Sequence, residues 1–293
     1  MKTHAWLTVA LLTLWITPLS ANDAAMNDGA SGPEPLGWRS GEESIIQMKS
    51  EHLDIHFGTR KTTVTVRFTF LSHKKGGPAK QKLGFPNSSR SEMDGDISGP
   101  IDNLVTRVDG KVVTSELIEG RYLEITKPDG SIFYEKTDDP ADPNGSSEGV
   151  RKHAWYVIEV DFPEGKEVVV ERQYDCPSGG NTNMEAFFIY ETRTGGAWKG
   201  KIEQLTAEVT FDDSVRTDLV AFTPKNGWVW SEDKSKATLI WKDFEPKSDQ
   251  DRDYFEISTL DLKRVEEITK ENPDDFPPVE DWITGWKQRE AER

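Results

Sequence analysis

The sequence predicts an all-β protein, an antiparallel β-sandwich that ends in a short C-terminal helical tail. Apolar residues recur at every second position over several stretches, which is the period of a strand with one buried face. Clusters of Gly, Pro, Asn and Asp separate these stretches, and no helical period of about 10 to 15 residues intervenes between them. Helical spacing appears only near the end of the chain.

The first strands are the clearest. From Val64 to Phe70, valine or phenylalanine alternates with threonine or arginine, and Leu53 to Phe57 alternates in the same way just upstream. These two stretches predict an early hairpin. Further along, Asp109-Gly110 separates two more apolar stretches and suits the positive backbone angles of a tight hairpin turn.

Later strands follow at short intervals. They are expected at Trp155 to Phe162, Glu167 to Tyr174, Glu185 to Thr192, Ile202 to Phe211, Leu219 to Thr223, Gly227 to Ser231, Ala237 to Trp241 and Tyr254 to Ser258. Beyond them, the apolar residues from Leu262 to Ile268 fall at helical spacing, and Asn272-Pro273 ends that helix. A second short helix is expected to carry Trp282 and Trp286, and the tail of residues 261–293 should dock on the sandwich.

The start of the chain is typical of an export signal at residues 1–21. Lys2 precedes an apolar run from Ala5 to Ile16, and Leu19-Ser20-Ala21 is a small-residue cleavage site. The run is shorter than the roughly 20 residues that span a bilayer. An uncleaved anchor is the alternative. We expect a periplasmic or secreted protein without a transmembrane anchor after cleavage, with a flexible linker at 22–43 and the sandwich domain at 44–260.

Composition narrows the classes of partner. The chain has 52 acidic and 36 basic residues, for a net charge of -16, which becomes -17 once Lys2 is removed with the signal. Nucleic acid is therefore an unfavourable partner, because binding it depends on clustered Lys and Arg. Cys176 is the single cysteine, so the fold must be stabilised by an apolar core without an intramolecular disulfide.

Catalytic and metal signals are weak. Asp139, Asp142 and Asn144 lie in a long polar connection, but alignment with a calcium loop places Pro140 and Arg151 where carboxylates are required. The pattern favours a solvated loop, and these three residues are the metal candidates that remain. On a strand, His52 and His56 would stand roughly 13 Å apart, too far to share one zinc ion. No nucleophile motif, catalytic residue or cofactor is predicted.

Tryptophans give the sharpest ligand hypothesis. Trp228 and Trp230 share one strand face, and Trp198 follows a glycine-rich turn. Exposed rings on a β-sandwich stack against sugars, so these three are the candidate binding residues for a glycan. The competing interpretation is that they fill the core between two sheets.

Four segments carry a family resemblance. They are Ile46-x-Met48-x-x-Glu51-x-Leu53-x-Ile55, Val64-x-Val66-x-Phe68-x-Phe70 leading to Gly84-Phe85-Pro86, Tyr190-x-x-x-Thr194-Gly195-Gly196-Ala197-Trp198-x-Gly200-x-Ile202, and Trp241-Lys242-Asp243-Phe244-x-Pro246. In these segments the chain resembles a family of exported bacterial proteins classed as a domain of unknown function. Lys201 and the extra Gly196 depart from its pattern. The resemblance implies a secreted or periplasmic β-sandwich and supplies no catalytic residue.

Together these observations favour a non-enzymatic envelope or extracellular binding or accessory protein. Its ligand would be a glycan or another envelope protein, held by loops of a rigid strand framework. The alternative is a hydrolase that acts on envelope glycans or peptides through carboxylates or a loosely bound metal. A purely structural accessory domain without a ligand is a third possibility.

Overall fold

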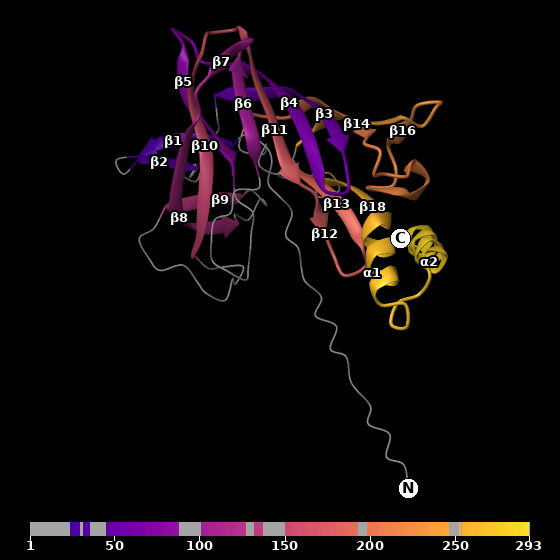
Figure 1. Cartoon of the computed structure of the whole chain (residues 1–293). Coiled ribbons are helices and arrows are strands. Elements are labelled where there is room, and N and C mark those ends of the chain that lie inside the picture. Colours follow the sequence, from indigo (N-terminus) through magenta and orange to yellow (C-terminus); the bar gives the residue numbers. More distant parts are fainter. Residues whose placement is uncertain are drawn as a thin grey trace.

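The structure is a computed structural model that describes residues 45–87, 101–126, 132–136, 150–192, 198–245 and 254–292, together with residues 24–29, 32–35 and 252. These residues form three β-sheets and two α-helices, and the helices lie at the C-terminal end as predicted (Figure 1). The mostly β class is thereby confirmed. The sheets number three and are not closed, so the antiparallel β-sandwich stays a prediction.

The large sheet has eight strands in the order β16-β17-β14-β3-β4-β11-β6-β7. Their bounds are Trp228–Trp230, Lys236–Phe244, Ile202–Phe211, Ile46–Phe57, Lys61–Ser72, Glu167–Pro177, Asp102–Val108 and Lys111–Val113. β3 and β4 form the predicted hairpin. β14 and β3 run parallel, with Glu208 in register with Asp54, so the predicted antiparallel order is wrong at this pair.

Two smaller sheets complete the fold. The six-stranded sheet has the order β2-β1-β5-β10-β8-β9, with bounds Gly32–Pro35, Ala24–Gly29, Ala79–Pro86, Val150–Phe162, Glu116–Thr126 and Ile132–Lys136. The four-stranded sheet has the order β12-β13-β18-β15, with bounds Gly179–Gly180, Glu185–Glu191, Tyr254–Leu260 and Val220–Thr223. A 3-10 turn, η2, spans Thr217–Leu219 just before β15.

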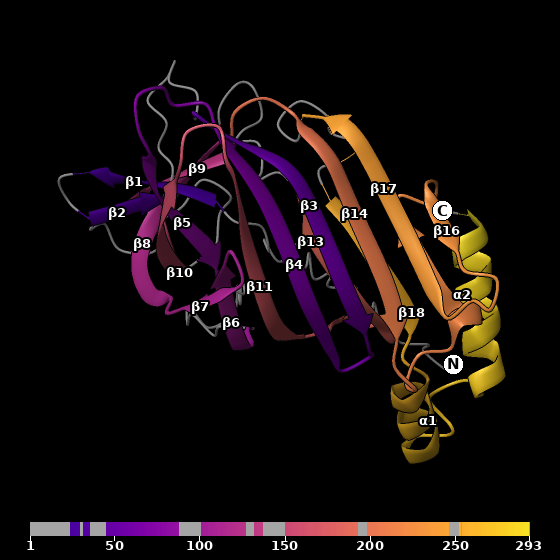
Figure 2. The same cartoon turned by 90° about the horizontal axis from the view of Figure 1, so that it is seen from above.

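Both smaller sheets contribute to one apolar core with the large sheet. Every second residue of β4 is buried, as the alternation from Val64 to Phe70 predicts. These side chains belong to the same cluster as Phe162 of the six-stranded sheet and Phe255 of the four-stranded sheet. In Figure 2, β13 and β18 lie behind the large sheet, and β5, β8 and β10 lie beyond its β6 end. One face of the large sheet is therefore covered by protein.

Local backbone features agree with the sequence at two places. Asp109 and Gly110 both have positive φ angles, 49° and 77°, and they form the two-residue turn between β6 and β7. On β3, the register shifts between Met48 and Ser50, so Lys49 is the extra residue of a β-bulge. The turn fixes the register of one edge of the large sheet.

The C-terminal helices pack on the far end of the four-stranded sheet. α1 spans Leu262–Glu271, with Asp261 as its N-cap, and α2 spans Val279–Glu292. Val265 of α1 and Trp286 of α2 form a second apolar cluster, separate from the main core, with Met184, Leu219 and Leu260. Neither helix is long and apolar enough to cross a bilayer, and no other helix in the described ranges is.

Candidate functional site

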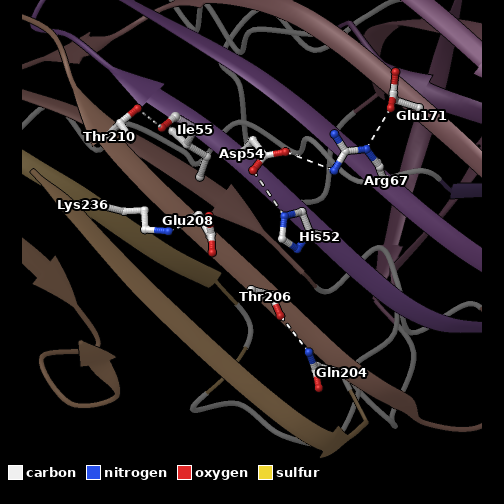
Figure 3. Close-up of polar contacts among 10 residues, drawn as sticks. All are labelled: His52, Asp54, Ile55, Arg67, Glu171, Gln204, Thr206, Glu208, Thr210 and Lys236. Carbon is white, nitrogen blue, oxygen red and sulfur yellow. Dashed lines mark hydrogen bonds and ion pairs between the residues drawn. The ribbon is translucent and has the colours of Figure 1, made fainter. Parts of the chain in front are cut away.

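The second face of the large sheet is polar, and we call it the outward face. It is formed by the residues that alternate with the buried ones on the central strands, and most of their side chains are partly exposed. They are His52, Asp54 and His56 on β3, Thr63, Thr65, Arg67 and Thr69 on β4, Val169, Glu171, Gln173 and Asp175 on β11, and Gln204, Thr206, Glu208 and Thr210 on β14. Figure 3 shows part of this face.

A row of charged side chains crosses four strands of the outward face. Glu171 lies in register with Arg107 on one side and Arg67 on the other. Its Oε1 accepts from Nη1 of Arg107 at 2.8 Å, and its Oε2 accepts from Nε of Arg67 at 2.9 Å. Arg67 Nη1 then lies 3.2 Å from Oδ2 of Asp54 (Figure 3). Each exposed pair contributes about 1 kcal/mol or less, but together the pairs orient the row.

Beyond the row, on the side of β17, the outward face carries further hydrogen bonds and a separate ion pair. His52 Nε2 lies 3.3 Å from Oδ1 of Asp54. Glu208, in register with Asp54 on the neighbouring strand, pairs with Lys236 Nζ at 3.1 Å. Close by, Gln204 Nε2 donates to Oγ1 of Thr206 at 2.9 Å (Figure 3). Polar contacts thus extend across most of the sheet.

Asp175 is held at one corner of the outward face. Thr63 Oγ1 donates to its Oδ1 at 2.6 Å, and Asn103 Nδ2 and Lys61 Nζ approach its Oδ2 at 2.9 and 3.2 Å. The hydrogen bond from Thr63, followed by that from Asn103, lowers the pKa of Asp175 from its usual value of 3.8. The carboxylate is therefore ionised throughout the physiological range of pH.

The bulge residue Lys49 occupies another corner. Its Nζ lies 2.8 Å from Glu167 and 3.7 Å from Glu203. The hydrogen bond to Glu167 and the charge of Glu203 raise the pKa of Lys49 above its usual value of 10.5. These shifts favour the charged forms, whereas a general acid or base needs a pKa near the working pH. Such groups are suited to recognition through fixed charges.

Charge on the outward face is close to balanced. Its ion pairs join six carboxylates, those of Asp54, Glu167, Glu171, Asp175, Glu203 and Glu208, to five cations, those of Lys49, Lys61, Arg67, Arg107 and Lys236. The whole chain carries -16. Most of the excess negative charge of the chain therefore lies outside these ion pairs.

The candidate tryptophans pack inward, away from the outward face. Trp198 is 2% exposed and packs 4.7 Å from the ring of Phe70. Trp228 stacks on Phe222 of the four-stranded sheet, with ring centroids 4.2 Å apart. Trp230 stacks on Phe211 at 5.4 Å, and both of these tryptophans are only partly exposed. The structure brings Trp228 and Trp230 together between two sheets and buries Trp198 in the core.

The metal candidates Asp139, Asp142 and Asn144 lie outside the described residues. Within the described ranges, no three His, Cys, Asp or Glu side chains lie in an arrangement that could hold a metal ion. His52 and His56 both lie on β3, the strand that the sequence predicts for them, and the charged row beside His52 is not predicted by the sequence. The sequence does show charged residues at alternate positions of the strands that carry the row. Which of them pair depends on the register between neighbouring strands, and the sequence does not show that register.

Comparison with known proteins supplies a fold but no family. No protein-family model matches the chain, and no curated protein matches its sequence. One similar structure is a Legionella pneumophila protein named "putative nutrient binding protein", with a TM-score of 0.52 and 14% identity over 77% of this chain and 70% of that chain. At this identity the likeness shows a shared fold alone.

Two peptidase structures are more distant. An M1 zinc metallopeptidase from Deinococcus radiodurans has a TM-score of 0.35 and 9% identity, over 74% of this chain and 42% of that chain. Leukotriene A4 hydrolase from Saccharomyces cerevisiae has a TM-score of 0.38 and 10% identity, over 76% of this chain and 32% of that chain. The chain thus spans less than half of either enzyme, and similarity at this level carries no argument about function.

Proposed function

We propose that the chain is an exported, non-catalytic binding protein that engages another protein of the envelope or extracellular space through the outward face of its large sheet. The observation that carries this proposal is the charged row from Arg107 through Glu171 and Arg67 to Asp54. Residues on paired strands hold their side chains more precisely than residues on loops, so the row presents charges in a fixed pattern. Export rests on the signal predicted at residues 1–21.

A protein partner fits this face better than a glycan does. Sugar recognition relies on exposed aromatic rings, and the outward face defined above is built of Thr, His, Gln, Val and charged residues. Trp228 and Trp230, the rings that could have served, stack on phenylalanines between sheets. A typical non-obligate protein interface contains about ten direct hydrogen bonds, and the outward face offers many oriented donors and acceptors for them.

The fold comparison is compatible with a binding role. The Legionella pneumophila structure that shares the fold is named for nutrient binding, which is a non-catalytic function. This supports the proposal only by analogy, because one fold serves many functions. Membership of the family of exported proteins that the sequence resembles stays a prediction, and it implies the same periplasmic or secreted location.

The test removes the Arg67–Asp54 ion pair from the outward face, together with the contact of Arg67 with Glu171, and leaves net charge unchanged. The tagged full-length protein, expressed with its own leader in its source cells, is crosslinked and purified. We expect a crosslinked partner with wild type and its loss with the double variant Arg67→Ala and Asp54→Ala. The matched control, Lys80→Ala with Glu159→Ala, removes a cross-strand pair of 3.2 Å from the six-stranded sheet and should keep the partner.

Equal crosslinking by both double variants would contradict the proposal. Binding of the wild type to a glycan array, lost in Trp228→Ala, would instead favour the glycan hypothesis. Turnover of envelope peptides or glycans by the purified protein would favour the hydrolase. Thermal unfolding of both double variants should stay within a few degrees of wild type, since the pairs removed are exposed.

A further inference from the structure

The β6 and β7 edge of the outward face differs in composition from its centre. Arg107 lies in register with Val112 on β7 and Glu171 on β11. Val105, two residues before Arg107 on the same strand, and Val169, two residues before Glu171, also face outward. Arginine is enriched at interface centres, and at this edge it stands among aliphatic side chains, whereas the central strands carry threonine and charged residues.

This edge also carries an exposed aliphatic side chain. Val112 is 69% exposed, the highest value among the large apolar residues that the structure describes as exposed. The side chain of Arg107 is 31% exposed. An exposed valine beside a partly exposed arginine offers both apolar area and hydrogen-bond donors to a macromolecule that lies flat on the sheet.

Arg107 retains unused donors. Only its Nη1 donates, to Oε1 of Glu171, and within the described residues Nε and Nη2 have no hydrogen bond or ion pair. Glu171 is shared, because its Oε2 accepts from Arg67, and Arg67 also pairs with Asp54. The carboxylate of Asp109, near this edge, accepts from the backbone N–H of Val169. The charged row therefore ends on a cation that a further carboxylate can complement.

We propose that Arg107 is the anchor of the protein interface on the outward face, and that it takes a partner carboxylate which stands next to an aliphatic side chain packed on Val112. This inference rests on the proposed function and narrows it to a partner of stated chemistry. A guanidinium matches a carboxylate in a planar, two-bond geometry that lysine lacks. The aliphatic side chain of the partner would bury apolar surface against Val112, and the partner carboxylate would fix the position of the partner on the sheet.

The experiment pans a random heptapeptide library on the immobilised full-length protein and measures enriched peptides by fluorescence polarisation. We expect the enriched peptides to combine Asp or Glu with Val, Ile or Leu. Arg107→Gln should weaken their binding about tenfold or more, and Arg107→Lys should restore only part of it. Val112→Thr should also weaken binding. Lys80→Gln, which removes an exposed cation from the six-stranded sheet, should leave it unchanged.

A double-mutant cycle separates contact from indirect effects. Replacing the carboxylate of the peptide by its amide should cost about as much as Arg107→Gln, and the two changes together should cost little more than one. Substitution on the peptide side keeps the test usable even if Arg107→Gln fails to fold. Peptides without carboxylates, additive losses in the cycle, or an absence of enrichment would each overturn the inference.

The outcome also distinguishes this inference from the proposed function. Peptides or a partner that bind Arg107→Gln as tightly as wild type, but not the double variant Arg67→Ala and Asp54→Ala, would place the interface at the centre of the outward face. In that case the proposed function stands and the anchor at Arg107 is wrong. Binding that survives all of these changes would contradict both.

Discussion

Tyr190 on β13 and Glu51 on β3 join the four-stranded sheet to the large sheet inside the core. The phenol oxygen of Tyr190 donates to Oε1 of Glu51. Tyr190 is 0% exposed and Glu51 is 1% exposed, so this contact is shielded from water. A buried carboxyl group is costly unless it is hydrogen-bonded, which makes the phenol important for the seating of one sheet on the other.

Removing the phenol oxygen should therefore destabilise the protein. We expect Tyr190→Phe to lower the free energy of unfolding by about 2 kcal/mol, since it leaves a buried acceptor of Glu51 without this donor. Urea denaturation measures the change. Tyr254→Phe, on β18 and 40% exposed, is the matched control and should cost less than about 0.5 kcal/mol. Equal losses for the two variants would show that the contact is not important for stability.

The thiol of Cys176 should be inert in the folded protein. The side chain is buried, and burial, with a smaller contribution from the charge of Asp175, raises its pKa to about 12. Only the thiolate reacts, so at pH 8 we expect labelling to be about a thousandfold or more slower than that of a free cysteine. Ellman's reagent measures this without interference from other thiols. Fast labelling under native conditions would mean that this end of β11 opens readily.

Acid should destabilise the outward face through Asp175. Its folded pKa lies below the unfolded value, so the stabilisation is present above the unfolded pKa and is lost as the pH falls through the folded pKa. Thr63→Val removes the largest cause of the shift. We expect the melting temperature of this variant to fall less than that of wild type when the pH is lowered from 5 to 2. Thr63→Ser keeps the hydroxyl and should behave as wild type, and calorimetry across this range checks both.

The sequence predicted local structure well because the spacing of apolar residues along the chain reflects the type of secondary structure. Alternation from Val64 to Phe70 predicted β4 and its buried face. Asp109-Gly110 predicted the tight turn between β6 and β7. The parallel pairing of β14 with β3 was missed, because the period of a strand does not identify its neighbour. For the same reason the charged row was missed, since the contact between Arg67 and Glu171 exists only in this register. Trp228 and Trp230 did share a face, but their partner Phe222 comes from another sheet.

The C-terminal helix α2 should separate from the rest of the fold when its anchor is removed. Trp286 is 2% exposed and belongs to the small cluster beneath the helices, which is distinct from the main core. Trp286→Ala should cost about 3 to 5 kcal/mol of local packing energy. Because the sheets keep their own core, we expect hydrogen exchange to show lost protection in α2 and retained protection in β3 and β4.

A surface contact of the same helix supplies the control for this variant. Lys287 Nζ lies 3.1 Å from Oδ2 of Asp218 in η2, and both side chains are about half exposed. Lys287→Ala should therefore change protection in α2 only slightly. If Trp286→Ala instead unfolds the sheets and the helix together, the two clusters form one cooperative unit and the tail is part of the core. If α2 alone loses protection, the helical tail is a separable element docked on the four-stranded sheet.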